Sequence, residues 1–290
     1  SPPWRRLLAP LLFAAAVPAA PAAPPARTPI EHVIVIVGEN RGFDHLFGLY
    51  EPRAGAQVGN LLSRGIVDRQ GQPGPHFALA AQRQAEGGNR YSPQPKVGAP
   101  YASLPTAAAD DQGRLPYPTG LPNGPYPISQ HLPAGRHSGN PIHRFFQMWQ
   151  QVNGGRMDLF AWTAETAGEG PSNQPPPKPG HSGQGGVALG FLNMAAGEAP
   201  YLRSLADRYA LSDNHHAAVM GGTSANYFAL ATADVAVFAE GGRLATPPRR
   251  RIENPDPQPG THNWYTEDGY DGGSYVACAD RTQPGVAAIQ

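Results

Sequence analysis

The sequence is poor in cysteine and in net charge, and it has no second long hydrophobic run after its N-terminus. A single cysteine, Cys278, cannot form an internal disulfide, so a disulfide-stabilised scaffold is excluded. The 22 basic residues balance the 22 acidic ones, so no overall field favours nucleic acid or an anionic membrane surface. No apolar run beyond residue 27 is long enough to cross a bilayer. We therefore expect no nucleic-acid partner and no transmembrane segment in the mature chain.

Glycine and proline, by contrast, are abundant. The 290 residues include 35 glycines and 34 prolines, a share close to that of irregular segments, so much of the chain is expected to be loop. Two stretches are especially rich in such residues and are predicted to be surface insertions, at about 92–136 and 165–187. The 40% hydrophobic content still suffices for a sizeable core. We predict one domain over residues 28–290, interrupted by these insertions.

The first 27 residues have the pattern of a secretory signal peptide. Arg5 and Arg6 precede an apolar run, residues 7–17, which is too short to span a bilayer. Residues 18–26 then offer small-residue cleavage sites. A disordered tail rich in alanine and proline is the alternative. The pattern predicts removal of residues 1–27 and export of the protein, to the periplasm or the medium.

The most informative segment is EHVIVIVGENRGFDHLFG, residues 31–48. Residues 33–37 are an unbroken β-branched run, typical of a strand buried on both faces of a parallel sheet. Glu39 and Asn40 follow, before a helix start expected within residues 40–44. Open α/β sheets bind ligands beyond the carboxyl ends of their strands, and a carboxylate beside an amide suits a hard cation or a phosphate. The segment therefore predicts an α/β fold with such a site at Glu39 and Asn40.

Three helices are expected further along the chain. Pro141 opens a helix that ends at Asn153-Gly154-Gly155, and residues 201–209 form a short amphipathic helix. The third helix would cover residues 223–232. Three of the ten histidines lie near these segments. His215 and His216 could supply a metal ligand, although adjacent residues of a strand face opposite sides, and His143 could equally be a surface histidine.

Gly221-Gly222-Thr223 would let the backbone approach a ligand closely where the third helix begins. The free amides and the dipole of a helix N-terminus stabilise a phosphate, and they favour ionisation of a hydroxyl beside a metal. Thr223 is therefore a candidate nucleophile. The alternative is that Thr223 serves only as the N-cap of the helix.

Together these segments resemble a bacterial phosphoesterase family, which includes phosphatidylcholine-type phospholipases C and a class of acid phosphatases of the alkaline-phosphatase-like superfamily. Its opening motif is similar to residues 39–48 at all but one position. Its second block resembles His143 with residues 153–158, and its nucleophile block resembles Asp213-Asn214 with residues 219–226. The likeness covers about residues 31–289, with loop insertions between the blocks.

The resemblance implies a phosphoric ester hydrolase of the α/β class, with a mostly parallel sheet flanked by helices. Glu39 and Asn40 would hold a divalent metal ion or the phosphate, and Thr223 would attack phosphorus. His143 and Asn226 would contact the phosphoryl oxygens or the leaving group. Water would then hydrolyse a covalent phosphothreonine. The substrate would be a phospholipid, cleaved at its headgroup, or a small phosphomonoester.

The sequence departs from the family pattern at three positions. Gly42 replaces a serine, Gly222 replaces a proline, and Trp149 stands where many relatives carry a second histidine. The family's downstream aspartate and histidine ligands would lie beyond Gln290, so the sequence predicts a C-terminally truncated chain. Two other hypotheses remain open. One is a truncated, non-catalytic relative that binds phosphate or metal, and the other is a sulfatase-like hydrolase, whose usual cysteine-containing motif is missing.

Overall fold

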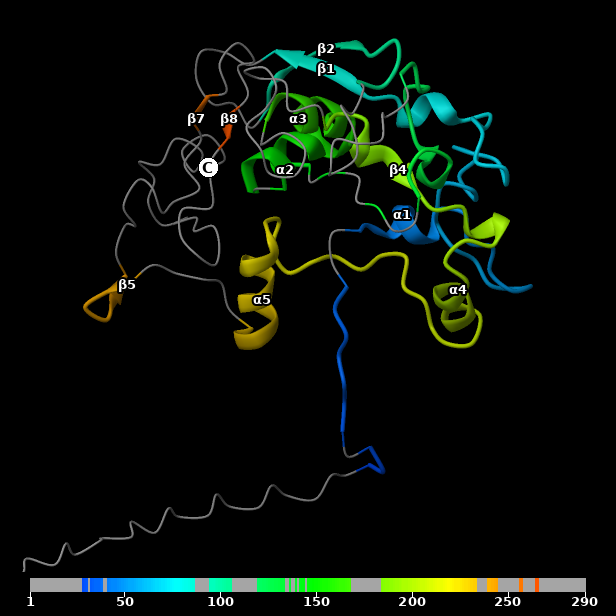
Figure 1. The fold of residues 1–290 in the computed structure, drawn as a ribbon. Helices are drawn as coiled ribbons and strands as arrows, with labels where there is room; N and C mark the ends of the chain where they lie inside the picture. The colour runs from blue at the N-terminus through cyan, green and yellow to red at the C-terminus, as the bar shows by residue number, and fades with distance from the viewer. Residues whose placement is uncertain are drawn as a thin grey trace, which may run out of the picture. The chain divides into compact units, whose positions relative to one another are not determined.

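The computed structural model describes the chain in two compact units, Ser1–Gly38 and Glu39–Gln290 (Figure 1). The described residues are 28–30, 32–38, 41–86, 94–105, 119–133, 136, 139, 141–143, 145–167, 184–233, 239–244, 256–257 and 264–265. The predicted signal peptide, residues 1–27, lies outside them.

The predicted first strand is not formed. Residues 32–38 belong to the first unit and adopt no regular structure, and the side chains of residues 33–37 are 56% to 90% exposed. A strand needs neighbouring strands to pair with its backbone N–H and C=O groups, and none of the described strands pairs with this segment. The prediction of a doubly buried strand is therefore wrong, because β-branched composition cannot supply the missing neighbours.

The second unit contains α-helices, short 3-10 helices and short strands. The α-helices are α1 (Phe43–Phe47), α2 (Phe145–Val152), α3 (Phe160–Thr166), α4 (Pro200–Ala206) and α5 (Thr223–Thr232). The 3-10 helices are η1 (Phe77–Ala80), η2 (Ile128–Gln130), η3 (Asn153–Gly155), η5 (Val187–Leu189) and η6 (Met194–Ala196). The strands are β1 (Arg83–Glu86), β2 (Lys96–Pro100), β3 (Tyr126–Pro127), β4 (Gly190–Phe191), β5 (Ala239–Glu240), β6 (Arg243–Leu244), β7 (Asp256–Pro257) and β8 (Trp264–Tyr265).

These strands form two-stranded sheets. β1 with β2, β5 with β6, and β7 with β8 are antiparallel, whereas β3 and β4 are parallel. Helices and strands are thus mixed, as expected for an α/β chain. The mostly parallel sheet is not seen in the described part of the chain, where parallel pairing is confined to β3 and β4.

Two clusters of buried apolar side chains form the core of the second unit. One consists of Leu104, Tyr126, Ile128, Leu132, Ala161 and Val187, and the other of Leu49, Ile66, Val67 and Phe191. The β3–β4 pair contributes to both, because Tyr126 lies opposite Gly190 and Phe191 follows Gly190. Leu49, which directly follows the first motif, is packed in the second cluster.

The predicted insertions are only partly surface loops. Leu104, Tyr126, Ile128 and Leu132 fall within residues 92–136 and are buried, so that part of the prediction is wrong. Proline and glycine disfavour long helices and strands, but they do not keep the apolar residues between them out of a core. The second insertion is described only at its ends, residues 165–167 and 184–187, where Ala167 and Val187 are buried.

The three predicted helices are confirmed. α2 begins at Phe145, slightly later than predicted, and gives way to η3 at the expected Asn153-Gly154-Gly155 stop. α4 has Pro200 in its first turn and ends at Ala206, while α5 begins at Thr223. None of the helices in the described ranges is long and apolar enough to cross a membrane.

Candidate functional site

The first motif is described from Arg41 onward. Glu39 and Asn40, the predicted metal or phosphate ligands, lie outside the described residues. After them, Gly42 has an extended backbone and is the N-cap of α1, which begins at Phe43. The expected helix start is thus confirmed.

Hydrogen bonds of His45 connect α1 to β4 and to the residue that follows it. Its Nδ1 lies 2.7 Å from the carbonyl oxygen of Gly190, and the N–H of Leu192 donates to the carbonyl oxygen of His45 at 2.8 Å. Because a carbonyl oxygen can only accept, the ring donates through Nδ1–H. In the neutral ring, Nε2 then keeps its lone pair. The helix that follows the predicted ligands is therefore attached to the core by both its backbone and a side chain.

The surroundings of α1 disfavour charge on two motif side chains. Burial lowers the pKa of His45, and the nearby guanidinium of Arg41 lowers it further, against the opposing effect of the Gly190 hydrogen bond. Burial also raises the pKa of Asp44, although a backbone hydrogen bond from Leu61 counteracts this. The neutral imidazole is thus the favoured form of His45 in the folded protein.

We expect this neutral histidine to make the fold acid-sensitive. The unfolded chain binds the proton at a pKa of about 6.5, above the folded-state pKa, so stability is complete above that value and falls as the pH drops below it. His45→Asn keeps an N–H for Gly190 but cannot titrate. Melting temperatures measured from about pH 8 to pH 5 should therefore fall more steeply for the wild type. Parallel curves for the two proteins would contradict the prediction.

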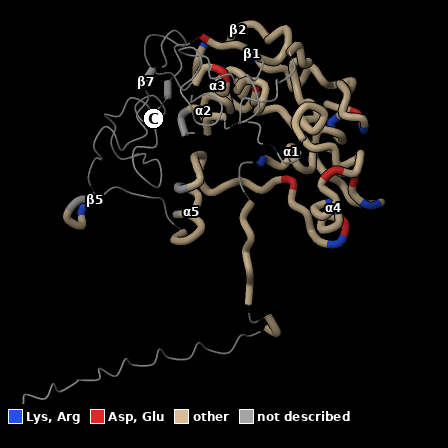
Figure 2. The backbone as a smooth tube through the Cα atoms, in the orientation of Figure 1, with Lys and Arg blue, Asp and Glu red and all other residues tan. Residues whose placement is uncertain are grey.

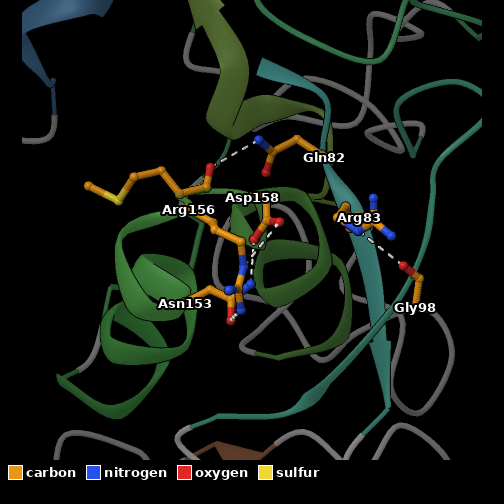
Figure 3. A network of polar contacts seen from close by, with 7 residues as sticks. Gln82, Arg83, Gly98, Asn153, Arg156 and Asp158 are labelled. Carbon is orange, nitrogen blue, oxygen red and sulfur yellow. Dashed lines mark hydrogen bonds and ion pairs between the residues drawn. The ribbon is translucent and has the colours of Figure 1, made fainter. Parts of the chain in front are cut away.

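A network of polar side chains holds the second block, as Figure 3 shows. Asn153 Nδ2 donates to Asp158 Oδ1 at 2.5 Å, and Arg156 Nη2 donates to Asn153 Oδ1 at 2.8 Å. Gln82 Nε2 donates to the carbonyl oxygen of Met157 at 3.3 Å. Asn153 and Asp158 are both buried. The hydrogen bonds of these polar residues thus stabilise the junction between α2, α3 and the start of β1.

The same junction contains strained backbone. Asn153 and Met157 have positive φ values of 44° and 56°, and the two glycines between them have φ values of 65° and 91°. A left-handed conformation is costly for a side chain such as that of Met157. The surrounding hydrogen bonds maintain it, and Met157 is left 52% exposed.

His143 precedes α2 and is half-buried. Its Nδ1 lies 2.9 Å from the carbonyl oxygen of Pro141, so this nitrogen donates and a neutral ring keeps the lone pair on Nε2. His143 thus has a fixed ring orientation and one nitrogen that can accept a proton. This is the arrangement that both a general base and a metal-binding histidine require.

Thr223 is the first residue of α5 and is half-buried. Gly222 has an extended backbone and is the N-cap, and no side-chain hydrogen bond caps this helix. The alternative that Thr223 is merely the N-cap is therefore wrong. Thr223 therefore belongs to the first turn of α5, whose N–H groups have no partners inside the helix, and no side-chain hydrogen bond caps them.

The side chain of Asn226 forms hydrogen bonds with the backbone of the turn that leads to Thr223. Its Oδ1 accepts from the N–H of Val219 at 3.2 Å, and its Nδ2 donates to the carbonyl oxygens of Val219, Gly221 and Gly222 at 3.1 to 3.4 Å. These contacts hold residues 219–222 against the first turn of α5. The structure therefore gives Asn226 a part in shaping the turn that ends at the candidate nucleophile.

A turn absent from the sequence predictions joins the first and third blocks. The N–H of Gly59 donates to Asp213 Oδ2 at 2.5 Å, while Leu61 supplies the backbone hydrogen bond to Asp44. Asn60, between them, is buried and bonds to both the Phe47 and Tyr50 carbonyl oxygens through Nδ2, at 2.8 Å each. We call residues 59–63 the bridging turn. The sequence Asn60-Leu-Leu-Ser63 offered a signal, since Asn and Ser commonly organise such turns through their side chains.

A cavity of about 610 Å³ opens beside the bridging turn. Its lining includes Asp44, Arg64 and His76 together with the apolar Leu61 and Ile66. Figure 2 shows acidic and basic residues interspersed along the described chain, with several of each around α4. The mixture agrees with the balanced charge of the sequence.

The predicted site residues are not all brought together. The bridging turn connects Asp44 with Asp213, whereas among the described residues the hydrogen bond of His143 goes to Pro141 and not to Thr223. His215 and His216 are exposed, and His216 Nε2 lies 3.1 Å from Asn214 Oδ1. Within the described ranges, no group of three His, Cys, Asp or Glu side chains could hold a metal ion.

Comparison with known proteins identifies the family. No curated protein and no solved structure matches the chain. The model of the Phosphoesterase family matches residues 30–284, which include all three motif blocks and the bridging turn. The chain therefore belongs to the Phosphoesterase family, whose members hydrolyse phosphoester bonds.

Proposed function

We propose that this protein is an exported, metal-assisted phosphoesterase with Thr223 as its nucleophile. Membership of the family supports phosphoester hydrolysis in general. The observation that carries the assignment of the nucleophile is the position of Thr223 at the start of α5, behind Gly221-Gly222 and without a capping role. The first-turn N–H groups of α5 are available to phosphoryl oxygens.

The reaction would proceed in two displacements. The Oγ of Thr223 forms a bond to phosphorus as the bond from phosphorus to the alcohol oxygen breaks, and the alcohol leaves with a proton. Water then attacks the phosphothreonine, which restores the hydroxyl and releases phosphate or a phosphorylated headgroup. His143 is suited to carry the proton, because Nδ1 is held by Pro141 and Nε2 can accept. Asn226 would act by keeping the turn before Thr223 in shape.

Glu39 and Asn40 are the proposed ligands of a divalent metal ion. A carboxylate and an amide oxygen are hard donors, and this pair fits Mg²⁺, Ca²⁺ or Mn²⁺ by its chemistry. A bound cation would offset the negative charge of the phosphoryl oxygens. Replacing Glu39 with Gln should therefore weaken metal binding, as measured by calorimetry with the metal alone. Unchanged metal affinity would remove Glu39 from the site.

The family blocks also support two wider proposals. The protein would belong to the alkaline-phosphatase-like superfamily, and it would be exported after removal of residues 1–27. A crystal structure whose fold lacks the topology of that superfamily would overturn the first proposal. N-terminal sequencing of the protein recovered from the producing cells would test the second, since recovered protein that still carries residues 1–27 would contradict their removal.

Hydrolysis of two nitrophenyl esters tests the central proposal. We expect release of nitrophenol from para-nitrophenyl phosphate, a phosphomonoester, or from para-nitrophenyl phosphorylcholine, a phosphodiester, and loss of this activity on chelation of divalent metal. The preferred ester separates a phosphatase from a phospholipase C. The alternative is a non-catalytic relative. It would turn over neither ester with any added metal, yet would still bind inorganic phosphate or the metal in calorimetry.

A further inference from the structure

We propose that Asp213 is a positioning residue. Its hydrogen bond to the bridging turn holds the nucleophile block in place relative to the first motif. The proposal rests on the phosphoesterase function above. It assigns a role to a carboxylate that the proposed mechanism does not use.

The contact between Asp213 and the bridging turn is a single short hydrogen bond that joins distant parts of the chain. Asp213 Oδ2 accepts from the N–H of Gly59 at 2.5 Å, across 154 residues of sequence. The charge on the acceptor strengthens such a bond, while the exposure of both residues lets water compete with it. A side chain on residue 59 would crowd the contact, because a Cβ there would lie 3.3 Å from Asp213 Oδ2 and 3.6 Å from Arg64 Nη2. Glycine at position 59 thus keeps the approach open.

Hydrogen bonds also attach the bridging turn to the end of the first motif. Asn60 is 3% exposed and donates to the carbonyl oxygens of Phe47 and Tyr50, at the end of α1. Its Oδ1 accepts from the N–H of Ser63 at 2.8 Å, which closes the turn. A buried amide with three such bonds leaves the turn little freedom. Asn60, the neighbour of Gly59, is therefore held against the end of α1.

A second contact supports the same alignment. The Tyr50 hydroxyl donates to Asp207 Oδ1 at 3.0 Å, just beyond α4. Residues 207 and 213 are thus both attached to the segment that follows α1. From Asp213 the chain continues to residues 219–222, which Asn226 fastens to α5. Among the described residues, the contact of Asp213 with Gly59 lies between α4 and Thr223 along the chain, so its loss should let the nucleophile block shift.

Steady-state kinetics of Asp213 variants test the proposal. We expect Asp213→Ala to lower kcat by about 10- to 100-fold with KM within about twofold, because small misplacements of a reacting group cost that much while binding survives. Asp213→Asn should recover most of kcat, since its amide oxygen can still accept from Gly59. Asp68→Ala is the matched control. Its carboxylate also accepts backbone N–H groups, but only those of Gln70 and Gln72 in its own turn, so kcat should not change.

Amide hydrogen exchange separates this proposal from the proposed function. The Gly59 N–H should be protected in the wild type and in Asp213→Asn, and should exchange faster in Asp213→Ala, whether or not the protein turns over a substrate. If exchange changes as expected while kcat does not, the positioning role is overturned and the phosphoesterase stands. Unchanged exchange, or a kcat of Asp213→Asn as low as that of Asp213→Ala, also overturns it. Absence of turnover in the wild type counts against the proposed function itself.

A second variant covers the case in which Asp213→Ala does not fold. Gly59→Ala keeps the N–H donor but places a methyl group against the carboxylate. It should lower kcat by less than Asp213→Ala would, again at nearly constant KM. Faster amide exchange at residue 59 of this variant would show that the contact is disturbed. If such a folded protein kept the wild-type kcat, the positioning role would be contradicted.

Discussion

Replacing Thr223 with alanine is expected to lower kcat for phosphoester hydrolysis about a thousandfold or more. The change removes the only group proposed to form a bond to phosphorus, and loss of a covalent nucleophile has effects of that size or larger. Thr223→Ser keeps a hydroxyl at the start of α5 and should retain measurable turnover. The measurement is nitrophenol release at saturating substrate, together with acid quenching and peptide mapping for a phosphorylated residue 223.

Thr232→Ala provides the matched control for this prediction. Thr232 is the last residue of the same helix, so the substitution removes the same atoms at the opposite end of α5. Its kcat should stay close to that of the wild type. Undiminished activity in Thr223→Ala, or a trapped phosphoryl group on another residue, would show that the nucleophile lies elsewhere.

Leu49→Ala is expected to destabilise the fold by about 2–5 kcal/mol, the usual cost of a large cavity in a packed core. Leu49 is 0% exposed and packs with Ile66, Val67 and Phe191. It also follows Gly48 at the end of the first motif, so the motif is attached to the core at this point. The free energy of unfolding, measured by urea titration of the two proteins, would show the loss.

Leu79→Ala is the control, because it deletes the same atoms from a side chain that is 78% exposed. Its free energy of unfolding should stay within about 0.5 kcal/mol of the wild type, as for most surface substitutions. Similar losses in the two variants would mean that Leu49 is not a core residue in solution. A larger loss for Leu79→Ala would contradict the packing of the second core cluster.

Local chemistry explains which helices could be predicted. Pro200 in the first turn of α4, the two glycines after α2 and the Gly222 N-cap before α5 act through their own backbone conformations. Such signals need no distant partner, so they can be recognised from a few residues. The same holds for the start of α1, where Gly42 precedes Phe43.

Burial was harder to predict, because it depends on what lies opposite. Gln147 and Gln150 on α2 are each 1% exposed, and Gln151 is 7% exposed and donates to Thr163 Oγ1. A composition-based prediction expects glutamine at the surface. Conversely, the apolar residues 33–37 are exposed, because none of the described strands pairs with them.

The sequence by itself determined the family, the three motif blocks, the helix start at Thr223 and the absence of a disulfide framework. These features depend on residue identity and on short spacings along the chain, and both can be read from the sequence alone. Only the tertiary structure decided that Gly222 rather than Thr223 caps α5, that His45 is bonded to Gly190, and that Asp213 meets Gly59. The last two contacts join residues more than a hundred positions apart, and such pairings depend on how the whole chain packs, which no local pattern specifies.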